Sequence, residues 1–399
     1  MYQGFSLVML VSLHDNHCVN GGLPLSNFQT PLFLNWQHQP HWPTLRDEFG
    51  CCETGASMLL SLTTAGGPVS YSRNKNFYNT TARYRSRLFT YAKVTRAADY
   101  IGGQNFAFHS KVRPGHHGWQ SSLTATPETI ARVQDILRIG PKLEPASPSE
   151  LIILRDGDGR PSDYRETPAI RKMRQRLVEI NEGIRTTMFT GIIPDAMVRI
   201  FNKSFNRGGR FYALGGSWQS MSKDARKQIR IGGEPVVEID YKTLHPALIY
   251  AQARQPLPDD CYQIGRWPRP LVKVAFLILI NAKKEHEARA AIARHDQMAV
   301  LAKPGSQPAY EIASDLMADI KARHAGIADA FHSDRGAELM RLDSDMAETV
   351  MHIMLMAGVV ILPVHDSFLV QQSQAAFLED TMLRVAYEAG YESLRVERA

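Results

Sequence analysis

The sequence predicts an α+β fold in which short strands and longer helices build two or three subdomains. Two apolar, strand-like runs support this prediction, residues 236–240 and 359–364, and an aspartate ends or follows each of them. A long amphipathic helix is predicted over 339–357, and a uniformly apolar helix over 269–281. With 399 residues, of which 44% are hydrophobic, the chain is long enough to bury a large core.

Composition limits the classes of protein to consider. The formal net charge is +6, which is compatible with an acidic partner such as nucleic acid. The sequence has no apolar run of about 18 residues, and the apolar stretch 5–13 is short and lacks a basic start. We therefore expect no membrane span and no secretory leader, and we expect a cytoplasmic protein. The cysteines form no CxxC pair and indicate no disulfide framework: Cys18, Cys51, Cys52 and Cys261.

Residues 1–120 are predicted to be irregular and of unknown role, because Gly, Pro, Asn and His are frequent up to about residue 70 and periodicity is poor. A zinc site is conceivable, although the spacing fits no standard finger: His14, His17, Cys18, His38, His41, Cys51 and Cys52. Between 72 and 96, basic and aromatic residues interleave. Either they bind nucleic acid by stacking and phosphate contacts, or the segment is a helix with buried aromatics and solvated charges.

A strand is predicted over 151–155 and a tight turn over 156–159. Thr167 and Pro168 indicate the start of a helix that ends near Gly183. Four cations lie along this helix and form either a solvated face or a contact to DNA: Arg171, Lys172, Arg174 and Arg176.

A basic segment leads into the first strand-like run. Between 203 and 230 there are seven basic residues and one acid, Asp224. Glycines beside Arg210 let the backbone approach a ligand closely, and clustered cations neutralise phosphates. The basic residues are Lys203, Arg207, Arg210, Lys223, Arg226, Lys227 and Arg230.

The two aspartates at the strand-like runs are the main candidates for chemistry. Asp240 ends the first run. Gly358 is predicted to stop the long helix before the second run, and His365 and Asp366 then form a turn before the short strand 368–370. A carboxylate in an apolar setting costs folding energy unless something binds it, and strand ends are where many enzymes place catalytic groups.

The apolar helix between these runs starts with Pro268 and Pro270, which fit a first helical turn. Arg269 and Lys273 lie four residues apart, so they share one face close to the helix N-terminus, where the helix dipole attracts anions. The residues after Lys273 are apolar on all sides, which indicates a buried helix. Two cations in the first turns of a buried helix therefore predict a triphosphate site. The alternative is a surface helix whose N-terminus the two cations merely cap.

These parts complement one another chemically. Two carboxylates on adjacent strands can hold two Mg²⁺ ions, or Mn²⁺ in their place, which activate a 3′-hydroxyl and neutralise a leaving pyrophosphate. The basic helix then binds the incoming triphosphate, and the basic segment holds a duplex beside the primer end.

Over roughly residues 200–399 the sequence resembles the single-subunit, right-handed polymerases of the family A (DNA polymerase I-like) type. Four short motifs carry the resemblance, and they occur in the family's order. They are the upstream primer–template motif at Gly209 and Arg210 with Gln219, motif A at Asp240 and Tyr241, motif B at Arg269 and Lys273, and motif C at His365 and Asp366.

The resemblance implies a role for each matched residue. Asp240 and Asp366 are the metal ligands, together with the backbone carbonyl of Tyr241. Lys273 contacts the triphosphate and protonates the pyrophosphate, helped by Arg269. Binding of the DNA primer–template falls to Arg210, Gln219 and His365, and Arg226 and Arg230 of the basic segment are further candidates for the same contact.

Three positions depart from the family pattern. His245 and Asn281 stand where DNA polymerases of this family usually have a glutamate and a tyrosine that help to exclude ribonucleotides. Both are therefore nucleotide-binding candidates, and the choice between deoxyribonucleotides and ribonucleotides stays open. Ser367 replaces a usual glutamate, and residues 365–368 resemble the phage-type RNA polymerases.

The predicted architecture is a right-handed polymerase fold with an antiparallel palm sheet, helical fingers and a thumb-like N-terminal half. After the irregular region we expect a thumb-like helical part at 121–200, palm parts at 201–261 and 336–399, and fingers at 262–335.

The predicted function is template-directed nucleotidyl transfer by a compact DNA-dependent DNA polymerase without a proofreading exonuclease, of a size that suits a phage, plasmid or other mobile element. The alternatives are an RNA polymerase or primase-like enzyme, and a nucleic-acid-binding protein that kept the fold but lost catalysis. A glycosidase with paired carboxylates fits less well, because it has no use for the basic helix between them.

Overall fold

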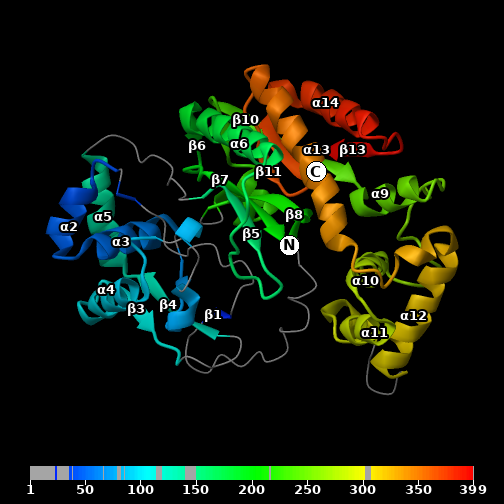
Figure 1. Ribbon diagram of the computed structural model, residues 1–399, viewed down its shortest axis with the longest axis horizontal. Helices are drawn as coiled ribbons and strands as arrows, with labels where there is room; N and C mark the ends of the chain where they lie inside the picture. Colours follow the sequence, from blue (N-terminus) through cyan, green and yellow to red (C-terminus); the bar gives the residue numbers. More distant parts are fainter. Residues whose placement is uncertain are drawn as a thin grey trace.

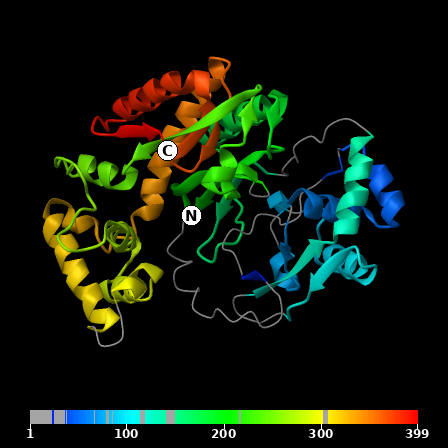
Figure 2. The same ribbon diagram turned by 180° about the vertical axis from the view of Figure 1, so that it is seen from behind.

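The structure is a computed structural model of the 399-residue chain. It describes residues 23–24, 36–37, 39–65, 67–78, 82–84, 86–113, 119–139, 150–214, 217–301 and 307–398. Two groups of elements are visible in Figures 1 and 2, one from the described chain up to residue 139 and one from residue 150 onward. Helices and sheets are both abundant, so the predicted α+β class is confirmed.

The N-terminal lobe, the described residues up to 139, packs helices against a small antiparallel sheet, and its core around Trp36, Leu59 and Leu123 continues into Ile153 and Val198 of the following elements. The expectation of an irregular region is therefore wrong for its described part. Its helices are α2 (Trp42–Phe49), α3 (Glu53–Ala65), α4 (Tyr91–Gly103) and α5 (Pro127–Arg138). Its strands are β1 (Leu23–Pro24), β2 (Val69–Tyr71), β3 (Ala107–Ser110) and β4 (Trp119–Ala125), with 3₁₀ segments η1 (Lys75–Tyr78) and η2 (Ala82–Tyr84).

The residues that made this lobe look irregular are helix boundaries. Pro43 lies in the first turn of α2, where its missing N–H costs nothing, and Gly50 ends the helix in a left-handed conformation with φ 55°. Helix α3 is buried over most of its length, from Thr54 to Leu62, so it has no polar face and no amphipathic period.

The described residues of this lobe do not support a zinc site. Burial raises the pKa of the Cys51 thiol to about 12, which opposes the thiolate that zinc requires. Within the described ranges no group of three or more His, Cys, Asp or Glu side chains is placed to hold a metal ion. His14, His17, Cys18 and His38 lie outside the described residues.

The basic and aromatic residues between 72 and 96 make internal contacts. The Arg73 guanidinium donates to both Asp99 oxygens at 2.8 and 2.9 Å. Arg83 bonds Asp163 at 2.8 Å and lies 3.9 Å from the centroid of the Tyr164 ring. These pairings favour the structural interpretation of this segment over a nucleic-acid contact.

A three-stranded sheet joins the lobe to the rest of the chain. It contains β5 (Ile152–Arg155), β7 (Met197–Asn202) and β8 (Ser204–Ala213), with β5 parallel to β7 and β7 antiparallel to β8. The predicted strand at 151–155 is thus confirmed. The predicted helix is α6 (Pro168–Thr186), and the Thr167 hydroxyl caps it by accepting from the Ile170 N–H at 3.3 Å.

Two of the four cations on α6 are paired within the protein, which favours a structural role for them. Arg174 forms an ion pair with Glu150, and Arg176 lies 3.7 Å from Glu348. Arg171 and Lys172 are exposed.

A six-stranded sheet carries both strand-like runs seen in the sequence. Its order is β11 (Leu362–Val364), β12 (Ser367–Gln371), β10 (Glu234–Lys242), β9 (Arg230–Ile231) and β6 (Phe189–Thr190), and β13 (Arg395–Arg398) also pairs with β10. All of these pairings are antiparallel, as predicted. The long helix is α13 (Gly336–Met356), and α14 (Ala375–Glu388) also contacts β10.

Most of the remaining helices occur in the chain between strands β10 and β11 of this sheet. They are α7 (Ser217–Ser220), α8 (Lys223–Arg226), α9 (Leu244–Gln252), α10 (Arg269–Asn281), α11 (Glu285–Ala293) and α12 (Ala309–Arg323), with η3 (Asp296–Val300), η4 (Ala325–Ala330) and η5 (Gln372–Gln374). Figure 1 shows α10, α11 and α12 as one group at the end of the molecule away from the N-terminal lobe. The names thumb, palm and fingers, with their boundaries, stay predictions.

The helix predicted to be uniformly apolar is α10, and it is buried as expected. Leu271, Ala275, Phe276 and Leu279 are fully buried, and only the first turns carry charge. None of the helices in the described ranges is both long and apolar enough to cross a membrane.

Truncating Leu279 should therefore destabilise the protein strongly. We expect Leu279→Ala to lower the free energy of unfolding by about 2–5 kcal/mol, because it removes a fully buried side chain and leaves a cavity. The control is Leu383→Ala on α14, where 42% of the residue is exposed. Urea unfolding followed by circular dichroism measures both, and equal effects of the two changes would show that α10 is not a core helix.

Candidate active site

Asp240 lies on β10, and Asp366 lies next to it in the turn that precedes the paired strand β12. In the β10–β12 ladder Asp240 is opposite Ser367, and the Tyr241 N–H points to the Asp366 carbonyl oxygen at 3.5 Å. Because strand side chains alternate, Ile239 and Tyr241 enter the core while Asp240 faces the opposite side of the sheet. The ladder thus unites two acids that are far apart in sequence.

The environment of Asp240 opposes its negative charge. Burial, followed by the charge of Asp366, raises the pKa of Asp240 to about 8, and the Lys273 ammonium counteracts this rise. Oxygen Oδ1 of Asp240 is buried and has no hydrogen-bond partner. A crowded, unsatisfied carboxylate of this kind suits a divalent cation, which prefers oxygen ligands and would cancel the repulsion. The donor set is thus compatible with Mg²⁺, although these two acids have no third acidic side chain placed to complete a cluster in the part of the chain described.

Two cations of α10 flank one aromatic ring beside these carboxylates. The Lys273 Nζ lies 5.9 Å and the Arg269 Cζ 5.3 Å from the centroid of the Tyr262 ring. Burial and, among the nearby charges, that of Asp366 raise the pKa of the Tyr262 hydroxyl, so the ring lies within electrostatic range of the acid. Arg269 also bonds Asp260 at 2.7 Å in a half-exposed pair.

A buried aspartate that the sequence analysis did not select organises the next part of the site. Both oxygens of Asp343, on α13, accept from the Nε of Arg210, at 3.2 and 3.1 Å. The same carboxylate lies 3.0 Å from Nε2 of His245. Asp343 is 3% exposed, and its charge is matched by Arg210, so α13, β8 and α9 are joined by one ionic network. The charge of Asp366 also acts on Arg210, which connects this network to the acids.

His365 occupies the tight turn between β11 and β12. Its φ of 63° lies in the left-handed region, which is uncommon for a histidine and marks a constrained position. Its ring packs edge-on against Tyr212, with 6.1 Å between centroids. Burial and the nearby Arg210 charge lower the pKa of His365 to about 4, so the imidazole is neutral at physiological pH.

Gln219 and Arg226 were predicted to contact the primer–template, but the structure gives them partners inside the protein. The Gln219 amide nitrogen donates to the carbonyl oxygens of Phe211 at 3.0 Å and Pro363 at 2.9 Å, which ties β8 to β11. Arg226 forms a two-pronged ion pair with Glu238. Sequence spacing cannot reveal such pairings, because the partners come from other strands.

Three further predicted residues differ in how the fold uses them. Arg230 is exposed on β9 and open to a ligand. Tyr241 donates its hydroxyl to the Met382 carbonyl at 2.7 Å, so only its backbone faces the acids. Asn281 donates to the Leu277 carbonyl at 2.7 Å and ends α10, about 12 Å along the helix axis from Lys273. Asn281 therefore lies at the far end of the helix from the triphosphate candidates.

One sequence signal could have revealed Asp343. It falls between Leu339 and Met346 on the apolar face of α13, where a charge is expected only if it is paired. Tyr262 has no comparable signal, because a buried tyrosine is common in any core.

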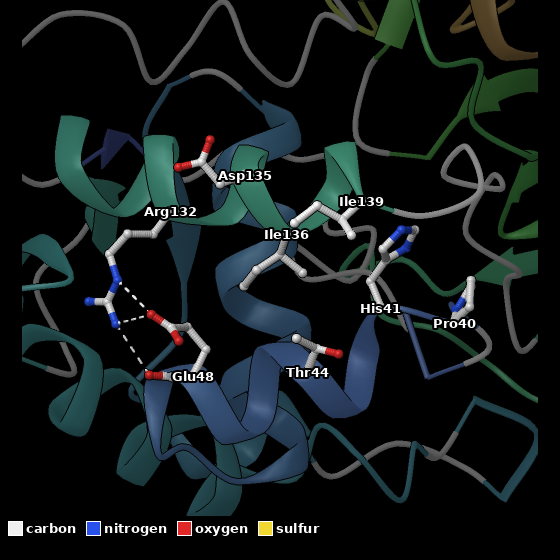
Figure 3. Close-up of a pocket in the computed structure, with 8 residues that line it drawn as sticks. All are labelled: Pro40, His41, Thr44, Glu48, Arg132, Asp135, Ile136 and Ile139. Atoms are coloured by element: carbon white, nitrogen blue, oxygen red, sulfur yellow. Dashed lines mark hydrogen bonds and ion pairs between the residues drawn. The ribbon is translucent and has the colours of Figure 1, made fainter.

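Two cavities of the described structure are lined by neither Asp240 nor Asp366. Figure 3 shows a cavity of about 440 Å³ between α2 and α5, with an ion pair of Arg132 and Glu48 at one end. It contains none of the residues that surround Asp240. A smaller cavity of about 200 Å³ lies beside Glu238 and is lined by Lys223, Arg226 and Lys227.

Comparison with known proteins finds similarity only among solved structures. No protein-family model and no curated protein matches the chain. Among solved structures, the chain is similar to the POL domain of Pol1 from M. smegmatis, described as a complex with DNA primer-template and dNTP. The identity is 14%, the alignment covers 87% of this chain and 69% of that chain, and the TM-score is 0.36. At this score the similarity carries no weight for function, which has to be inferred from the site itself.

Removing Asp343 should be costly because it leaves Arg210 buried without its partner. We expect Asp343→Ala to lower the free energy of unfolding by about 3–5 kcal/mol. Asp224→Ala removes the partner of Lys227 in a solvent-exposed pair and should leave the unfolding midpoint unchanged. Chemical denaturation of the two variants provides the measurement, and a stable Asp343→Ala protein would contradict the buried network.

The raised pKa of Asp240 predicts a specific pH dependence. Between its ordinary value of 3.8 and about 8, the folded chain holds a proton that the unfolded chain has released, so ionisation of Asp240 costs stability as the pH rises through this range. Asp240→Asn should therefore melt at a higher temperature than the unchanged protein at pH 9, and the difference should vanish toward pH 4. Thermal melting in EDTA at both pH values measures this.

Adding Mg²⁺ at pH 9 should raise the melting temperature of the unchanged protein but not that of Asp240→Asn, because only the former has the charged site. Identical pH profiles of the two proteins in EDTA would show that Asp240 is not held in a repulsive environment.

Proposed function

We propose that this protein catalyses template-directed nucleotidyl transfer, as a compact DNA-dependent DNA polymerase that uses two Mg²⁺ ions. The observation that carries the proposal is the proximity of Asp240, on β10, to Asp366, in the turn before the paired strand β12, with the charges of Asp366 and Lys273 both acting on Asp240. Paired carboxylates opposite a cation match the needs of phosphoryl transfer, in which charge develops on the attacking and the leaving oxygens.

Asp240 and Asp366 would hold the divalent cations, with the carbonyl oxygen of Tyr241 as a further candidate ligand. When bound, such ions supply Lewis-acid stabilisation of the attacking and leaving oxygens. The protein contributes a rigid frame, because Asp240 belongs to the β10–β12 ladder and Asp366 directly precedes β12, while the other side of this ladder packs into the core through Ile239 and Phe368. Preorganised charge of this kind avoids reorganisation during the reaction.

The cations of α10 suit the incoming triphosphate. Arg269 and Lys273 lie on one face of the helix, flank Tyr262 and stand near its positive dipole end. In the proposed reaction Lys273 holds the triphosphate and can give the proton on Nζ to the departing pyrophosphate oxygen. Its attraction to the ionised Asp240 keeps the ammonium directed at the site.

The primer end would lie beside Arg210 and His365. Arg210 acts electrostatically on both Asp366 and His365, and the neutral His365 ring can pack against a sugar or base without adding charge. The exposed Lys223 and Arg230 extend this basic surface for the phosphates of a DNA primer–template. Gln219 and Arg226 shape that surface through their internal contacts.

The choice of sugar is the point on which a second function competes. His245 shares Asp343 with Arg210, and Asn281 bonds its own helix. These two residues stand where the DNA polymerases that the sequence resembles carry the residues that exclude ribonucleotides. An RNA polymerase or primase-like activity is therefore the alternative, with the same acids and cations.

Primer extension on a DNA template with Mg²⁺, run separately with dNTPs and with NTPs, tests the proposal. We expect extension with dNTPs and a loss of at least about 100-fold in Asp366→Asn and Asp240→Asn, since even groups behind metal ligands cost 10–100-fold when replaced. Glu388→Gln, an exposed change on α14, serves as the control with unchanged activity.

Each other outcome has a clear meaning. Extension with NTPs alone moves the protein to the RNA-synthesising class. Full extension by Asp366→Asn overturns the proposed site. Tight DNA binding without any extension supports the third possibility, a polymerase-like fold that binds nucleic acid but does not catalyse.

A further inference from the structure

Glu238 is an acid of the same sheet face that the proposed mechanism leaves without a role. It lies two residues before Asp240 on β10, so both side chains leave the strand on the same side. Only 11% of the Glu238 side chain is exposed. A nearly buried carboxylate must be paired and hydrogen-bonded to be tolerated, so its partners indicate what it does.

The first partner is Arg226, which arrives from the basic segment around α8. Its Nε donates to Oε2 at 3.0 Å, and its Nη2 donates to Oε1 at 3.0 Å and to Oε2 at 2.8 Å. The Arg226 Nη1 is bonded to the carbonyl oxygen of Met221 at 2.8 Å, which fixes the guanidinium from behind. Such a two-pronged pair sets the orientation of the carboxylate as well as its charge.

The second partner is Ser367, whose hydroxyl donates to Oε1 of Glu238 at 2.7 Å. Ser367 follows Asp366 directly in sequence and is opposite Asp240 in the ladder, and it is 4% exposed. Glu238 therefore bonds Ser367, whose backbone is joined to Asp366 and paired with Asp240 in the ladder. Its negative charge also reaches Asp240 and, after burial and Asp366, contributes to the unfavourable field there.

We infer that Glu238 is a positioning carboxylate of the metal site, which holds the Asp366 turn through Ser367 and adds negative field that favours a divalent cation. It does not act as a direct ligand, because the described side chains place no third acid with Asp240 and Asp366 around one ion. In the polymerases that the sequence resembles a glutamate is usual at the position of Ser367. Glu238 thus brings a carboxylate to the serine from the neighbouring strand.

This inference rests on the function proposed above, and equilibrium binding of Mn²⁺ without nucleotide or DNA tests it separately from activity. The electron paramagnetic resonance signal of free Mn²⁺ gives the dissociation constant. We expect Asp240→Asn to abolish binding, Glu238→Gln to weaken it on the order of 10-fold, and Ser367→Ala to weaken it in the same direction.

Glu397→Gln is the matched control. Glu397 is opposite Asp240 on the other side, in β13, and its charge also acts on Asp240, but 51% of its side chain is exposed. Because water screens an exposed charge, we expect its removal to change the Mn²⁺ dissociation constant by less than about 2-fold.

The outcomes distinguish the role of Glu238 from the existence of the metal site. Unchanged Mn²⁺ binding in Glu238→Gln, with binding lost in Asp240→Asn, overturns the role of Glu238 and leaves the proposed function intact. Equal losses in Glu238→Gln and Glu397→Gln also overturn it, because the effect is then one of general charge. Unchanged binding in Asp240→Asn overturns the metal site itself.

Loss of folding has to be kept apart from loss of binding, because Glu238→Gln leaves Arg226 without its counter-charge. Circular dichroism melting checks each variant. The double variant Arg226→Gln with Glu238→Gln replaces the ion pair by two amides that can bond each other, and the inference requires it to be folded and still weak in Mn²⁺ binding. Normal Mn²⁺ binding by this double variant overturns the inference.

Discussion

The antiparallel pairing of β10 with β12 is the constraint on which the site depends. Its register places Ile239 opposite Phe368 in the core and Asp240 opposite Ser367 on the other face. A slip of one residue would send the acids into the core and the apolar side chains into the site. Tyr241 secures the register from the core side of the sheet, since its hydroxyl bonds the Met382 carbonyl on α14. The apolar face of the ladder thus sets the positions of the charged face.

The charges above this ladder are held by helix α13. Arg199 on β7 is 1% exposed, and it bonds the Gly209 carbonyl at 2.7 Å and Asp345 on α13 at 2.7 Å. Two residues earlier on the same helix, Asp343 holds Arg210. Gly209 sits between these pairs with φ 88°, and a Cβ there would lie 2.9 Å from the Ser344 hydroxyl, so only glycine allows this approach. Buried ion pairs add little net stability, but breaking one is costly, so this network favours a single arrangement of β8 against α13.

The N-terminal lobe shows where prediction from sequence failed and why. Helix α3 has no polar face because it is enclosed by the other elements of the lobe, so the periodicity that reveals a surface helix is missing. The strands of this lobe are short, and β2 has three residues. The partner of Gln219 is a different case, since its amide bonds β11, which is more than a hundred residues away in sequence. The sequence identifies a polar residue but does not reveal its hydrogen-bond partner in the fold.

After the N-terminal lobe, the sequence by itself indicated the main elements around the site, with Asp240 in a strand, Asp366 in a turn between strands, and Arg269 and Lys273 in the first turns of a helix. Hydrophobic periodicity, proline at helix starts and glycine at helix ends are local properties, so they can be recognised without the fold. Only the tertiary structure decided which charges are paired. Asp343 meets Arg210 across 133 residues of chain, and Glu238 meets Ser367 across 129. Such contacts depend on strand register and helix packing, which arise from the summed burial of many side chains rather than from any short stretch of sequence.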